Sequence, residues 1–183
     1  MLATTPSKAD ESAIARNNRS SSAGVAESIL RNSRMVVFCG SGATSAIDKM
    51  VGILGLRSAP HANAGSIPPD QRPVVFIGPY EHHSNELPWR ESIADVVTIP
   101  EDRDGHVDLD TLRTELVEHA DRPLRIGAFS AASNVTGILT DTRAIARVLH
   151  EHGALSFWDF AAAAPYIDID MNPADDPFGY LDA

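Results

Sequence analysis

Five short apolar runs, separated by segments in which apolar residues recur at helical spacing, limit the folds open to this chain of 183 residues. Each run has the length of a buried strand and lacks the alternation of a strand with one wet face. The runs lie at residues 35–38, 74–77, 95–99, 124–129 and 154–158. Continuous apolar strands joined by amphipathic helices are typical of a mainly parallel sheet covered on both faces. We therefore predict an α/β fold.

Four segments between or before these runs are predicted helices. Asp108 can cap a helix with an apolar face of Leu109, Leu112, Leu116 and Val117, and Gly153 can end the helix that begins near Asp141. The predicted helices are 23–32, 43–54, 108–117 and 141–152. Residues 1–20 are predicted to be a ragged N-terminal segment, and residues 57–72 a long loop.

Charge and cysteine content exclude several classes of protein. The 15 Lys and Arg against 25 Asp and Glu give a net charge of -10, which repels a phosphate backbone, so we expect no nucleic-acid partner. There is neither a membrane-length apolar run nor a signal peptide, which predicts a cytoplasmic protein without a membrane partner. The single cysteine, Cys39, excludes an internal disulfide, and at the end of an apolar run it is expected to be a small core residue.

Polar groups follow four of the predicted strands. Because ligands of open α/β sheets bind at the carboxyl ends of the strands, these groups are the candidate site. They are the turn at residues 40–45 (GSGATS), the segment 81–85 (EHHSN), the stretch 133–137 (SNVTG), and Asp159.

The glycine turn has two interpretations. Free N–H groups at the start of the following helix, with the hydroxyls of Thr44 and Ser45, could bind a phosphate. The same residues could instead form a tight turn in which Ser or Thr caps the helix. The turn also partly matches a dinucleotide fingerprint, although the acidic residue expected about 20 residues later falls in a proline-rich loop.

His82 and His83 are adjacent, so on an extended segment their rings point in opposite directions, and no third metal ligand is evident. We therefore predict no metal site; an imidazole here could stack on an aromatic ring or be simply solvated. Asp159 lies at the mouth of a hydrophobic strand, where a carboxylate needs a partner. That partner could be a backbone amide or a protonated ring nitrogen, and the latter is what pyridoxal phosphate chemistry requires.

In this order and spacing, the four segments resemble the class V aminotransferase family of pyridoxal-phosphate enzymes, which includes cysteine desulfurases and selenocysteine lyases. The resemblance runs from about Arg34 to Ala183. It implies part of the large domain of a fold-type I transferase that binds pyridoxal 5'-phosphate and acts on an amino acid, as a homodimer when full-length. It also implies site roles: phosphate binding by Gly42, Ala43 and Thr44, ring stacking by His82, contact with the phenolic oxygen and the substrate by Asn134, and pairing with the pyridine nitrogen by Asp159.

The chain departs from the family pattern at two places. The family commonly has glutamine three residues after the aspartate, where this chain has Ala162. The family's Schiff-base lysine would lie just past Ala183, and neither Lys8 nor Lys49 can replace it. Residues 21–183 are therefore predicted to be a partial cofactor-binding domain that ends before the lysine and is inactive alone. The alternatives are a nicotinamide-dinucleotide-binding oxidoreductase domain and a non-catalytic binding module.

Overall fold

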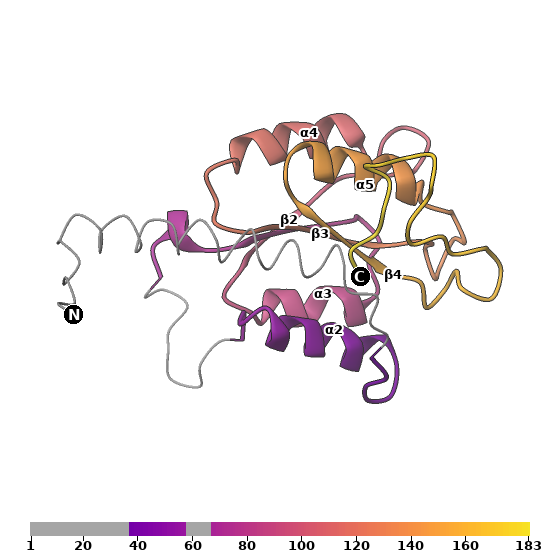
Figure 1. Cartoon of the computed structure of the whole chain (residues 1–183), viewed down its shortest axis with the longest axis horizontal. Coiled ribbons are helices and arrows are strands. Elements are labelled where there is room, and N and C mark those ends of the chain that lie inside the picture. The colour runs from indigo at the N-terminus through magenta and orange to yellow at the C-terminus, as the bar shows by residue number, and fades with distance from the viewer. Residues whose placement is uncertain (1–36, 58–66) are drawn as a thin grey trace, which may run out of the picture. The chain divides into compact units, whose positions relative to one another are not determined.

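The computed structural model describes residues 37–57 and 67–183 (Figure 1). The chain divides into two units, residues 1–37 and residues 38–183, and the second contains every described helix and strand. The predicted ragged segment 1–20, the predicted helix 23–32 and the first half of the predicted strand 35–38 lie outside the described residues.

Four parallel strands form the sheet, in the order β2-β1-β3-β4. They are β1 (Val74–Ile77), β2 (Asp95–Thr98), β3 (Arg125–Ser130) and β4 (Leu155–Asp159). The α-helices are α2 (Ala43–Ile53), α3 (His83–Arg90), α4 (Leu109–Glu118) and α5 (Thr142–Glu151), with a 3-10 turn at Pro69–Gln71. Helices α2 and α3 cover one face of the sheet and α4 and α5 the other (Figure 1). The predicted α/β class with a mainly parallel sheet is confirmed.

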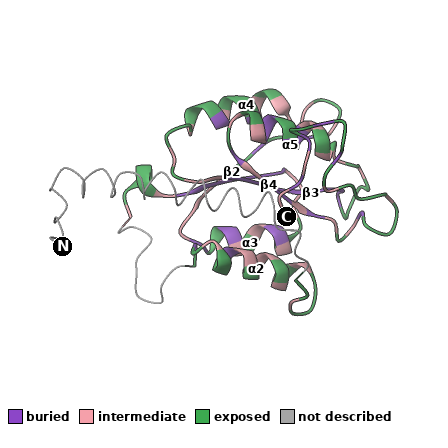
Figure 2. Cartoon of the chain, in the orientation of Figure 1, coloured by how far each residue is buried: buried purple, intermediate pink, exposed green. Residues whose placement is uncertain are grey.

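Burial on both faces explains why the strands are apolar throughout. In β1, Val74 and Phe76 pack in the core under α4 and α5, whereas Val75 and Ile77 pack in the core under α2 and α3. All four residues of this strand are buried. Figure 2 shows the same contrast, with buried strands between helices whose outer sides are exposed. The carboxyl end of β1 is therefore held between two helical layers.

The prediction of a buried strand at residues 35–38 is wrong for the half that the structure describes. Val37 and Phe38 are in no strand, and the Phe38 side chain is 95% exposed. Cys39 is half-buried and ends no strand, so its prediction as a core residue at a strand end is also wrong. An apolar run is buried only where another element covers it, and no described element covers Phe38.

Helix α3 falls in the polar segment that the sequence analysis assigned to no element. Its sequence, HSNELPWR, contains Pro88 and buries only Asn85 and Trp89, which are one helical turn apart. His83 begins this helix, so the two histidines are not on an extended segment as predicted. None of the helices in the described ranges has the length and apolar character that a membrane crossing requires.

Two adjacent residues of α4 test the core assignment. Leu116 is fully buried in the core under α4 and α5, whereas Val117, predicted on the same apolar face, is 62% exposed. Leu116→Ala is expected to lower the free energy of unfolding by about 2–5 kcal/mol, because it leaves a cavity. Val117→Ala is expected to change it by less than about 0.5 kcal/mol. Urea unfolding of both variants measures the difference, and equal losses would contradict this packing.

An ion-pair cluster at the amino end of the sheet makes stability depend on pH. Asp95 accepts from Arg122 and, at 3.3 Å, from Arg72. Burial opposes ionisation of Asp95, but the two guanidinium groups lower its pKa below the ordinary value. The unfolded chain therefore takes up this proton first as the pH falls. The contribution of the Asp95 ion pairs to the free energy of unfolding is complete above the ordinary aspartate pKa. It is lost as the pH falls through the lowered pKa of Asp95 in the folded chain.

Asp95→Asn removes this contribution. The gap in unfolding free energy between the wild-type chain and Asp95→Asn should therefore shrink as the pH is lowered from neutral, in urea unfolding at a series of pH values. Asp121→Asn, at an exposed position, is the control for the loss of a carboxylate. A gap for Asp95→Asn that shrinks no more than the gap for Asp121→Asn would refute the assignment.

Candidate functional site

Asp159 lies on the face of the sheet that α2 and α3 cover. Phe157, two residues earlier on β4, packs in the core under these helices, and side chains two apart on a strand share a face. Asp159 is the partner of Ser130 in the register of β3 and β4, so both side chains stand at the carboxyl edge of that face. Asp159 as a whole residue is only 9% exposed, and its Oδ1 accepts from the N–H of Ala161 at 2.8 Å. The ion pairs of the described residues include none with this carboxylate.

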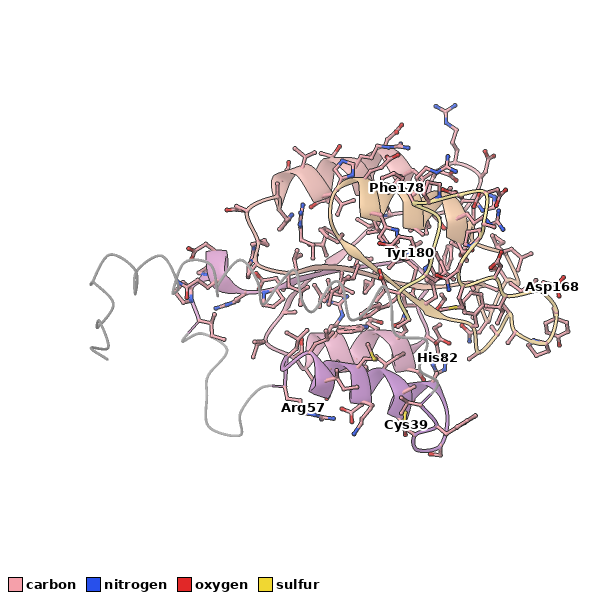
Figure 3. The ribbon with its side chains drawn as sticks, in the orientation of Figure 1. Cys39, Arg57, His82, Asp168, Phe178 and Tyr180 are labelled. Carbon is pink, nitrogen blue, oxygen red and sulfur yellow. The ribbon has the colours of Figure 1, made fainter. Side chains whose placement is uncertain are left out.

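His82 is the N-cap of α3 and stands at the start of that helix, on the same side of the sheet (Figure 3). Its Nδ1 accepts from the backbone N–H of Ser84 at 3.1 Å, so the neutral ring carries its proton on Nε2. The Ser84 hydroxyl lies 2.9 Å from the same Nδ1 and 2.8 Å from the hydroxyl of Thr44. A chain of contacts therefore joins Thr44, on α2, to His82, the N-cap of α3, through Ser84. The sequence analysis did not identify Ser84 as the link.

The start of α2 carries no side-chain cap. Gly42 is its N-cap, with a φ of 110° that favours glycine. No side chain accepts a capping hydrogen bond from the N–H groups of the first turn. The Ser45 hydroxyl accepts instead from the N–H of Ser41, at 3.3 Å. The capping of this helix by Ser or Thr, which was one interpretation of the turn, is therefore not observed. An uncapped helix start with nearby hydroxyls can bind an anion.

Glu81 is a second carboxylate at this edge of the sheet, and the sequence analysis gave it no role. It follows β1 and directly precedes His82. Its side chain accepts from the N–H groups of Ser130 and Gly78, at 2.9 and 3.2 Å. Burial raises the pKa of Glu81, and hydrogen bonds from Ser130, Asn85 and Gly78 offset part of that rise. The available sequence signal was a charged residue separated from a buried strand only by Gly78, Pro79 and Tyr80.

Asn134 lies in the loop after β3 and is exposed. This loop is held by the Ser133 hydroxyl, which accepts from the N–H groups of Val135 and Thr136 at 3.3 and 3.2 Å. Asn134 and Ala162 line one hollow, between this loop and the segment after β4. No described hydrogen bond joins Asn134 to Thr44, His82 or Asp159. The structure thus brings Thr44 and His82 into one network and places Asp159 on the same face, with Asn134 in a neighbouring loop.

The histidine and carboxylate side chains of the described residues form no cluster that could hold a metal ion. The rings of His82 and His83 are 6.2 Å apart and tilted by 46°. Within residues 37–57 and 67–183 there is no group of three His, Cys, Asp or Glu side chains that could hold an ion. What the described residues offer is an uncapped helix start, an imidazole ring and a buried carboxylate.

Comparisons with known proteins give the family. The family model described as "Aminotransferase class-V" matches residues 11–178. A probable cysteine desulfurase of Halalkalibacterium halodurans is 32% identical over 101 residues, which cover 53% of this chain and 24% of that protein. A probable cysteine desulfurase of Streptomyces coelicolor is 28% identical over 151 residues, which cover 80% of this chain and 34% of that protein. The chain thus spans about a quarter to a third of these relatives' length.

Solved structures share the fold. The cysteine desulfurase CsdA of Escherichia coli superposes with a TM-score of 0.54 at 23% identity, over 90% of this chain and 39% of that one. The alanine–glyoxylate aminotransferase of Nostoc sp. gives a TM-score of 0.57 at 22% identity, over 84% of this chain and 37% of that one. With the family match over most of its length, this chain belongs to the class V aminotransferase family and has the sheet architecture of fold-type I enzymes.

Proposed function

We propose that this chain is the cofactor-binding part of a pyridoxal-phosphate enzyme that acts on an amino acid. The observation that carries the proposal is the buried carboxylate of Asp159, which has one backbone donor and no ion pair among the described residues. A buried carboxylate in this state is stabilised by a cation, and a protonated pyridine ring is such a cation. When bound, that ring withdraws electrons from the α-carbon of the amino acid.

The other residues fit the remaining parts of the same ligand. The uncapped start of α2, at Gly42 and Ala43, together with the Thr44 hydroxyl, would bind the phosphate. The imidazole of His82, held by Ser84, would lie against the face of the ring. Asn134 would bond the phenolic oxygen, since Ala162 has no polar side-chain atom to do so. Family membership supports these assignments over the nicotinamide alternative.

Among the described residues, we propose none as the lysine that binds the cofactor covalently. Lys49 is exposed on α2, and the Lys8 position is outside the described residues. We therefore expect this chain to bind pyridoxal phosphate reversibly, without covalent attachment, and to turn over no amino acid. Homodimer formation and a cytoplasmic location are proposed for the full-length enzyme. The relatives' names favour cysteine as one substrate to test and alanine as another.

The phosphate site is tested with Thr44→Val. Removing this hydroxyl is expected to weaken binding of pyridoxal phosphate and of inorganic phosphate by a similar factor, about tenfold, which corresponds to about 1.4 kcal/mol. Thr114→Val, on the exposed side of α4, is the matched control and should bind as the wild-type chain does. Equilibrium dialysis gives both affinities. Binding of a nicotinamide dinucleotide with none of pyridoxal phosphate would overturn the proposal.

The ring site is tested with Asp159→Asn. Loss of the negative charge is expected to leave inorganic phosphate affinity unchanged, while the ring nitrogen of bound pyridoxal phosphate loses its proton at a lower pH than in the wild-type chain. The absorbance of the bound cofactor, recorded as a function of pH, reports this change. Asp168→Asn, in the loop after β4 (Figure 3), is the matched control. Identical titrations for Asp159→Asn and the wild-type chain would rule out the assigned role.

A further inference from the structure

Glu81 joins three elements at the carboxyl edge of the sheet. Oε1 accepts from the N–H of Gly78, just after β1, and from the N–H of Ser130, at the end of β3. Oε2 accepts from the Ser130 hydroxyl at 2.5 Å and from the Asn85 side-chain amide, in the first half of α3, at 2.8 Å. One side chain thus fixes the ends of two strands and the start of a helix relative to one another.

Asn85 extends this network into the core. Its Nδ2 also donates to the carbonyl of Ala128 at 3.2 Å, and its Oδ1 accepts from the indole N–H of Trp89 at 3.3 Å. Asn85 and Trp89 are 3% and 1% exposed, so these bonds are shielded from water. The start of α3, which carries His82, is therefore attached to β3 through Glu81 and Asn85.

The backbone leaves room for this carboxylate. A Cβ atom added to Gly78 would lie 2.6 Å from Oε1 of Glu81, which is too close for both to keep their places. The four donors to Glu81 are neutral, and no nearby cation lowers the pKa of its carboxyl group. Burying a carboxylate without a cation is costly, so four well-placed donors are needed to hold it.

We propose that Glu81 is a positioning residue of the cofactor site, which acts by fixing the His82 ring beside the face that carries Asp159. This inference rests on the proposed function for its consequence in ligand binding, but the position of His82 is a property of the chain itself. Glu81 precedes His82 directly, and Ser130, which Glu81 holds by two bonds, is the register partner of Asp159. Glu81 therefore sets the spacing between the stacking ring and the carboxylate.

The first measurement needs no cofactor. In a proton–carbon NMR spectrum of the histidine rings, the His82 signal is assigned by its loss in His82→Gln. We expect Glu81→Ala and Gly78→Ala to shift and broaden this signal, the first by removing the acceptor and the second by displacing it. Glu81→Gln keeps one acceptor oxygen and should give a smaller change. Glu86→Gln, which lies in α3 and is paired with Arg90 near the surface, is the matched control.

The second measurement is a double-mutant cycle on pyridoxal phosphate affinity. Glu81→Gln is expected to weaken binding at least about fivefold in the wild-type chain and by less than about twofold in the His82→Gln chain, because Glu81 acts through His82. Equal effects in both backgrounds would overturn the inference. An unchanged His82 signal in Glu81→Ala would also overturn it. If circular dichroism shows that Glu81→Ala is unfolded, an unchanged His82 signal in Gly78→Ala decides the same question. A wild-type chain that binds no pyridoxal phosphate would refute the proposed function, and the NMR result would still decide the role of Glu81.

Discussion

The fold depends on burying both faces of β1 and β3 under helices. Val75 and Ile77 face α2 and α3, Val74 and Phe76 face α4 and α5, and the resulting double layer leaves little freedom to the strands. All four described strands run in the same direction, so their carboxyl ends meet at one edge. Polar residues that follow the strands in sequence are therefore brought together at that edge, although they are separated by tens of residues along the chain.

The electrostatics of the site follow from that arrangement. Two carboxylates, Glu81 and Asp159, lie at the edge on either side of Ser130, and both are held by neutral donors. Asp95, at the amino end of the sheet, is paired instead with Arg122 and Arg72. The contrast separates a structural cluster, in which the protein supplies the cations, from a candidate site, in which a ligand is proposed to supply one. Membership in the class V aminotransferase family agrees with that interpretation.

Several elements could be predicted because their signals are local. The apolar runs gave the four described strands, and Asp108 and Asp141 cap α4 and α5 by accepting from backbone N–H groups. Helix α3 was missed because its buried side chains contact residues far away in the sequence: Asn85 donates to the carbonyl of Ala128 on β3, and Trp89 packs against Phe157 on β4. Residues 37 and 38 were assigned to a buried strand because an apolar run does not reveal whether anything covers it. The role of Glu81 could not be predicted because two of its hydrogen bonds come from Ser130, which is 49 residues away in the sequence.

The sequence by itself determined the α/β class, the parallel sheet, most element positions and the family resemblance. Hydrophobic periodicity, capping residues and short motifs each depend on residues that are close together in the sequence, so they can be identified without the tertiary structure. Only the tertiary structure decided that Thr44 contacts His82 through Ser84, that Asp159 shares their face of the sheet, and that Glu81 joins β1, β3 and α3. These contacts depend on strand register and helix placement, which are set by the packing of the whole core and by no local segment.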